Sequence, residues 1–207
     1  MNNFLENFKE GLIAFWETST EEEKNELLAN ILIYANANPD SFKRDVKEIQ
    51  FDPELRPLPF ILEALSKETK NWGDFYVNVL NDILEKAEQA DKPEDILTFT
   101  SEFYYIEEAD GEFVRRIANR LLKALDSKKE AVRLKAICTL PGYLRNPVIK
   151  NRDLILSRLE GKLKDKSWKA RYLAFQYLKF EDLLPKGRRL SFKDKVLKML
   201  FGEPGSI

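Results

Sequence analysis

Two stretches in the C-terminal half decide the fold: AVRLKA at Ala131–Ala136 and KARYLA at Lys169–Ala174. Each places an arginine after a small or apolar residue, an alanine three residues later and a leucine seven residues later, at Leu140 and Leu178. The two arginines lie 38 residues apart. Self-similarity at a period near 40 residues indicates a solenoid of stacked helix pairs.

Helical spacing of apolar residues continues along nearly the whole chain, and strand-like alternation is absent. We therefore expect an all-α, right-handed superhelix of about ten helices. The predicted helical segments are 3–17, 20–37, 40–49, 59–66, 71–90, 93–110, 112–125, 127–141, 146–164, 167–180 and 191 onward. Starts near 93, 128 and 167 define three helix pairs, about the number at which such repeats become stable.

Capping signals fix several of these helix starts. Capping boxes are predicted at Thr20–Glu23 and Ser127–Glu130, N-caps at Ser167 and Ser191, and a cap with an N1 proline at Asn146-Pro147. Prolines interrupt the pattern in an irregular corner at 52–59. We expect a single domain over 1–207, with less regular helices in 1–66 and repeated helix pairs in 71–201.

The repeated segments resemble HEAT repeats. The residues that carry the resemblance are Leu121–Asp126 followed by Val132, Arg133 and Ala136, and Leu159–Asp165 followed by Ala170, Arg171 and Ala174. That family has a leucine-rich second helix, an aspartate in the turn and an arginine that opens the next helix. The resemblance implies an α-solenoid in which aspartate and arginine join neighbouring repeats. It assigns this structural role to Asp126, Arg133, Asp165 and Arg171.

The composition narrows the classes of function. The chain of 207 residues contains no histidine and one cysteine, Cys138, which we expect to be buried in a helix. Mechanisms that depend on histidine are excluded, and we expect no metal site. Glycine patterns that cradle phosphates are also absent, so we expect no cofactor.

No apolar run approaches the roughly 18 residues of a membrane span, and the N-terminus lacks the basic region of a signal peptide. We therefore expect a cytoplasmic protein with no membrane partner.

Charge is distributed unevenly between the two halves of the chain. Residues 1–111 hold 10 basic and 25 acidic residues, whereas residues 112–207 hold 24 basic and 10 acidic residues. Such asymmetry is a feature of proteins with polyanionic partners. The candidate residues for binding a polyanion or another partner are Arg116, Arg120, Lys123, Arg158, Lys162, Arg188, Arg189, Lys195 and Lys198.

Two other interpretations of the charge stay open. In the first, the basic residues are solvated and their aliphatic stems cover apolar surface. Alternatively, the basic half of one copy pairs with the acidic half of another copy, in contacts that build rings or filaments.

Two further clusters have structural interpretations. Phe99 and Phe103 continue a helical apolar stripe and are expected in the core, whereas Tyr105 lies off it. The acidic cluster Glu107, Glu108 and Asp110 is expected to be a solvated helix end rather than a catalytic pair.

A second resemblance concerns DNA alkylation-repair glycosylases, which are built from HEAT-like repeats and use Trp and Asp side chains. Asn71–Asp74 and Trp168 with Arg171 carry it. In that family the Trp and Asp are farther apart than Trp72 and Asp74 are, and the basic motif comes one repeat sooner than Arg133.

From these observations we expect a binding or scaffolding module, not an enzyme, that presents a helical groove to a protein or peptide. The alternative is DNA or RNA binding through the basic half, and a glycosylase-like activity ranks behind both.

Overall fold

The computed structural model describes residues 9–11, 13, 20–51, 58–66, 70–97 and 112–202. The described part of the chain is all-α and contains no strand, as expected from the sequence. The helices are α2 (Glu21–Ala37), α3 (Pro39–Ile49), α4 (Leu58–Ser66), α5 (Lys70–Gln89), α6 (Pro93–Leu97), α7 (Glu112–Ala124), α8 (Glu130–Tyr143), α9 (Arg152–Gly161), the 3-10 helix η2 (Lys162–Lys164), α10 (Trp168–Phe180) and α11 (Phe192–Phe201).

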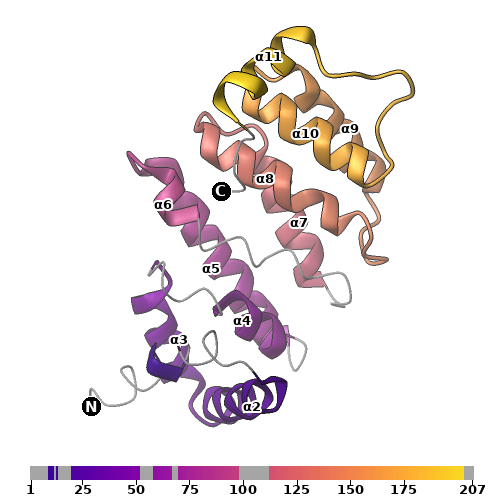
Figure 1. Ribbon diagram of the computed structural model, residues 1–207. Coiled ribbons are helices and arrows are strands. Elements are labelled where there is room, and N and C mark those ends of the chain that lie inside the picture. Colours follow the sequence, from indigo (N-terminus) through magenta and orange to yellow (C-terminus); the bar gives the residue numbers. More distant parts are fainter. Residues whose placement is uncertain are drawn as a thin grey trace.

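The helices follow one another along an elongated stack, from α2 at one end to α10 and α11 at the other (Figure 1). Helices two apart in the chain pack together: α5 with α7, α6 with α8, and α8 with α10. Gly73 allows a close approach of α5 to α7, because a Cβ there would lie 3.1 Å from Cβ of Phe113. One core cluster of buried apolar residues runs from Ala35 to Leu178.

Helix α8 lies at the centre of this packing. Every residue from Ala131 to Tyr143 is buried, including Arg133, Lys135 and Thr139. Its neighbours α5, α6, α7 and α10 surround it. A helix buried on all sides cannot show an amphipathic stripe, so its polar residues must be satisfied within the protein.

Helices α2 and α3 contact the rest of the protein through side chains of α5. Trp72 is buried, its Nε1 donates to Oδ1 of Asn36 at 2.9 Å, and its ring meets Phe42 edge-on at 5.6 Å. Lys47 of α3 forms an ion pair with Asp82 of α5. The described helices before residue 66 therefore share one core with the repeated part.

Three of the predicted caps are confirmed. The hydroxyls of Thr20, Ser167 and Ser191 accept hydrogen bonds from backbone N–H groups at the starts of α2, α10 and α11. The hydroxyl of Thr20 also donates to the carboxylate of Glu23 at 2.7 Å, so the two residues of the predicted capping box are in contact.

Two predicted helix starts are wrong, because side chains that resemble caps form turns instead. Ser127 accepts from the N–H of Lys129, and α8 begins at Glu130 without a side-chain cap. Asn146 accepts from the N–H of Val148 at 2.9 Å, and α9 begins at Arg152 rather than at residue 147. Asn and Ser bond to an N–H two residues on in such turns, so sequence alone does not separate the two uses.

Several predictions lie outside the described residues. These are most of the helix at 3–17, most of the corner at 52–59, and the segment 98–111 with Phe99, Phe103, Tyr104, Tyr105, Glu107, Glu108 and Asp110.

Helix α10 ends in a tight turn at Asp182. Asp182 has a φ of 56°, in the left-handed region usually occupied by glycine. The N–H of Asp182 donates to the carbonyl of Lys179, and the N–H of Leu183 donates to that of Leu178 at 2.8 Å. This pair of bonds is a Schellman motif, and it turns Leu183 back toward the helix ends.

Candidate binding surface

The two arginines of the sequence repeat make the same contacts. Nη1 of Arg133 donates to the carbonyls six and five residues before it, at 2.9 and 3.2 Å. Nη1 of Arg171 donates to the carbonyls at the same two offsets, at 2.7 and 3.1 Å. The 38-residue repeat in the sequence is therefore also a repeat of backbone contacts.

Each arginine also binds the carboxylate of an aspartate that lies further along the chain. Arg133 donates through Nε and Nη2 to the two oxygens of Asp165, at 3.2 Å each, which confirms the expected tie. Arg171 binds Asp194 at the start of α11, with Nε 3.1 Å from Oδ2. These hydrogen bonds from Arg171, joined by one from Ser191, hold the pKa of Asp194 below its usual value.

Asp126 has a different partner from Asp165. No arginine of the repeat pattern precedes it, and the side chains of Arg158 and Lys162 on α9 pair with it instead. Asn151 also donates to Oδ1 of Asn119 at 3.3 Å. Polar contacts therefore join α7 and α9 at two places, one at Asp126 and one at Asn119.

Three of the nine candidate basic residues take part in such ties. Arg116 pairs with Asp74 of α5, and Arg158 and Lys162 pair with Asp126. The first pair joins α7 to α5, and the other two join the α9 segment to the turn that follows α7. Their charges are therefore partly neutralised within the protein.

The other six candidates fall into two groups that lie on different elements. Arg120 and Lys123 lie on α7, partly and largely exposed. The remaining four lie around α11: Lys195 is exposed, Nζ of Lys198 sits 5.3 Å above the ring of Tyr172, and Arg188 and Arg189 line a hollow of about 270 Å³ beside Ser191.

The residues that resemble the glycosylase motif have structural contacts. Trp72 is buried against Phe42, and Asp74 pairs with Arg116. Trp168 stacks near Phe201 with ring centroids 6.3 Å apart, and Arg171 is bound to Asp194.

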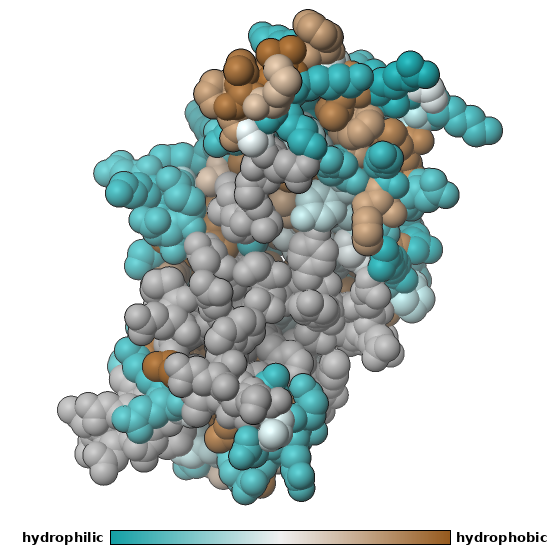
Figure 2. All heavy atoms as spheres, viewed as in Figure 1, coloured by the Kyte–Doolittle hydropathy of each residue, from teal (hydrophilic) through white to brown (hydrophobic). Residues whose placement is uncertain are grey.

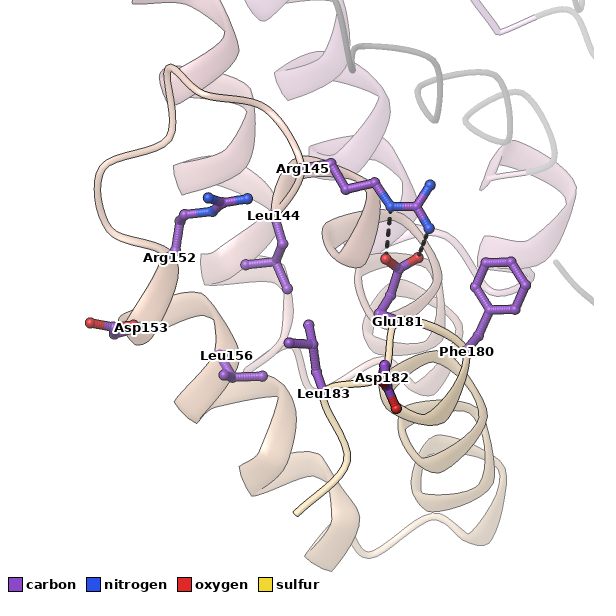
Figure 3. Close-up of a pocket in the computed structure, with 9 residues that line it drawn as sticks. All are labelled: Leu144, Arg145, Arg152, Asp153, Leu156, Phe180, Glu181, Asp182 and Leu183. Atoms are coloured by element: carbon purple, nitrogen blue, oxygen red, sulfur yellow. Dashed lines mark hydrogen bonds and ion pairs between the residues drawn. The ribbon is translucent and has the colours of Figure 1, made fainter. Parts of the chain in front are cut away.

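A larger hollow, of about 520 Å³, opens where the ends of α8 and α10 meet the start of α9. Its apolar floor consists of Leu144, Leu156 and Leu183, which come from three separate elements and point toward one another (Figure 3). Phe180 lies at its edge with 77% of its surface exposed. Figure 3 shows the Phe180 ring beyond Glu181 and directed away from the leucines, so the hollow has a leucine floor and an exposed aromatic residue at its outer edge.

Charged groups form the rim of this hollow. Arg145 donates to both oxygens of Glu181 at 2.8 Å, a bidentate pair that fixes the rim between α8 and α10 (Figure 3). Arg152 and Asp153 lie exposed on the opposite side, at the start of α9. Within the described part of the chain, Arg152 forms no ion pair.

The sequence did not predict this hollow. Its walls come from three helix ends, and its position depends on the left-handed Asp182, which no glycine marks. The available signal was Phe180, an aromatic residue followed directly by two acidic residues and two leucines.

The described residues lack two kinds of feature, a cluster of metal ligands and a membrane-spanning helix. They contain no group of three potential metal ligands of the Cys, Asp and Glu type. None of the helices in the described ranges is long and apolar enough to cross a membrane.

Comparison with known proteins gave no match, whether to a family model, a curated protein or a solved structure.

Proposed function

We propose that the protein is a non-catalytic binding module that holds a peptide segment of a partner protein in the hollow at the ends of α8, α9 and α10. The observation that carries this proposal is the hollow itself, about 520 Å³ with a leucine floor and an exposed phenylalanine at its edge. Binding sites combine apolar walls with a few polar groups at the rim in this way.

The architecture that we infer for the module is a short α-solenoid of the HEAT type. It is supported by the equivalent backbone contacts of Arg133 and Arg171 and by the packing of helices two apart in the chain. In such stacks each unit contacts mainly its neighbours, and the surface along the units is available for a partner.

The chemistry of the hollow defines the segment that it would accept. An apolar side chain of leucine or phenylalanine size would contact Leu144, Leu156 and Leu183. Arg145 is neutralised by Glu181, and the other charged groups of the lining are Arg152, Asp153 and Asp182, which are exposed and of both signs. The preferred ligand is therefore a peptide with an apolar anchor, and the rim accepts polar groups of either charge beside it.

Selection from a displayed peptide library against the purified protein tests this proposal. Phe180→Asp places a charge at the edge of the hollow, and Leu154→Asp is the matched control. Leu154 is 50% exposed on α9 and does not line the hollow. Selected peptides should bind wild type and Leu154→Asp alike and lose about tenfold or more in affinity on Phe180→Asp, a cost of about 1.4 kcal/mol. Failure to select a peptide, or equal binding by Phe180→Asp, would refute the site.

Polyanion binding is a second candidate, favoured by the position of Arg188 and Arg189 on a shared hollow beside α11. Replacing both with alanine should lower heparin and single-stranded RNA affinity and reduce its salt dependence. Replacing Lys164 and Lys166, two exposed lysines outside this hollow, removes the same charge as a control. Equal effects of the two double variants would indicate non-specific attraction only.

A further inference from the structure

The C-terminal end of the helix stack carries an apolar surface that nothing in the described chain covers. On α11, the large side chains of Phe192, Met199, Leu200 and Phe201 are between 66% and 83% exposed. Hydrophobic atoms gather at this end of the molecule in Figure 2, where α11 lies in Figure 1. Large apolar side chains that are exposed together mark a surface that binds a partner.

The charged residues around this apolar surface are mainly basic. Lys193 and Lys195 of α11 are exposed, as are Arg188 and Arg189 in the preceding loop. The one acidic residue of α11, Asp194, is buried in its pair with Arg171. We define the C-terminal face as Phe192, Lys193, Lys195, Met199 and Leu200, and leave out Phe201, which lies on the opposite side of α11 near the ring of Trp168. A partner for this face needs apolar contact area surrounded by carboxylates.

The opposite end of the stack has these properties. On α2, Ala29, Ile33 and Ala37 are exposed and follow one another at intervals of four, so they form one strip on the helix. Ile33 is 68% exposed, and the alanines leave the strip flat. Glu26 and Glu22 are exposed one and two turns before Ala29, on the same side of the helix. We define these five residues as the α2 strip.

We propose that the C-terminal face of one copy binds the α2 strip of a second copy, head to tail. Large aromatic and methionine side chains would pack on the flat alanine and isoleucine strip, with Lys193 and Lys195 opposite Glu22 and Glu26. Like charges oppose pairing of two C-terminal faces or of two α2 strips. The contact is heterologous, so it leaves one free binding end of each kind and extends into a filament or closes into a ring.

Sedimentation velocity over a range of protein concentrations, at low and at high salt, provides the first test. Wild type should form oligomers that grow with concentration and dissociate in high salt, because salt screens the exposed charges. Leu154→Asp, on α9 between the two ends, should assemble like wild type. A protein that stays monomeric at submillimolar concentration in low salt would overturn the proposal.

Mixing two variants tests the head-to-tail geometry. One variant carries Glu22→Lys and Glu26→Lys, and the other carries Phe192→Asp and Met199→Asp. All four positions are exposed, so circular dichroism should show both variants folded. Each should be monomeric alone, and an equimolar mixture should give a one-to-one dimer that does not grow, since each variant keeps one intact end. If the α2 variant assembled like wild type, or if the mixture gave no dimer, the head-to-tail contact would be wrong.

Discussion

Replacement of Arg133 should destabilise the protein far more than replacement of Arg158, although both arginines join neighbouring units. The side chains of Arg133 and Asp165 are only 5% and 7% exposed, whereas those of Arg158 and Asp126 are 41% and 59% exposed. In Arg133→Met, the buried carboxylate of Asp165 keeps only the hydrogen bond from the N–H of Ser167 and a long contact with Lys162. The backbone carbonyls of Ser127 and Lys128 also lose the hydrogen bonds that Arg133 donates to them. Breaking a buried pair in this way costs about 3–5 kcal/mol.

Arg158→Met removes a solvent-exposed pair, which is worth about 0–1 kcal/mol. For a protein of this size 1 kcal/mol corresponds to about 2–4 °C in Tm. We therefore expect Arg133→Met to lower Tm by about 6–20 °C and Arg158→Met by less than about 4 °C. Thermal unfolding followed by circular dichroism measures both.

A double variant separates the buried charge from general disruption. Asp165→Asn removes the charge but keeps an oxygen for the N–H of Ser167, so Arg133→Met with Asp165→Asn should be more stable than Arg133→Met alone. Equal Tm losses for Arg133→Met and Arg158→Met, or no recovery in the double variant, would refute the assignment of Arg133 as a buried tie.

Three further predictions concern single positions. Asp182→Gly should raise stability by up to about 1 kcal/mol in urea unfolding, because glycine adopts its positive φ without strain; a loss would show that the aspartate side chain itself stabilises the turn. Burial raises the pKa of the Cys138 thiol, so a thiol reagent should label it only as fast as the protein opens, and rapid labelling in the native state would contradict its burial. The lowered pKa of Asp194 means that its contribution is complete above the usual carboxyl pKa of 3.8 and is lost as pH falls through the lower folded value. The stability difference between wild type and Asp194→Asn should therefore be constant from pH 7 to 5 and shrink in acid, and an early loss near pH 6 would be inconsistent with this.

The sequence predicted the repeated core because the arginine of each unit has local contacts. Arg133 and Arg171 bind carbonyls five and six residues away, so a short motif contains the whole arrangement. The partner carboxylates were less predictable. Asp165 follows Arg133 by 32 residues, but Asp194 follows Arg171 by only 23, because α11 reaches back to α10 after the 181–191 loop.

Surface features were predicted less well because several helix ends build each of them. The hollow needs Leu144, Leu156 and Leu183 to converge, and the C-terminal face depends on which side of α11 packs on α10. In α11, Phe192, Val196 and Leu200 follow one another at intervals of four and form an apolar side of the helix, but Phe192 and Leu200 are exposed to solvent. Helical periodicity identifies an apolar side and does not tell whether the same chain covers it.

The net charge of a segment of sequence does not measure the charge that is available to bind a partner. Residues 112–207 carry 24 basic and 10 acidic residues, yet Arg116 neutralises an aspartate of the acidic half and Arg158 and Lys162 share Asp126. Ion pairs between helices thus neutralise Arg116, Arg158 and Lys162, while Arg120 and Lys123 of α7 and Arg188 and Arg189 near α11 lie outside these pairs. The basic excess of residues 112–207 therefore divides into ion pairs within the protein and accessible charge, and part of the accessible charge lies beside the exposed apolar side chains of α11. A polyanion that binds beside α11 leaves the ion pairs of Arg116, Arg158 and Lys162 intact, whereas one that binds through these three residues must break them.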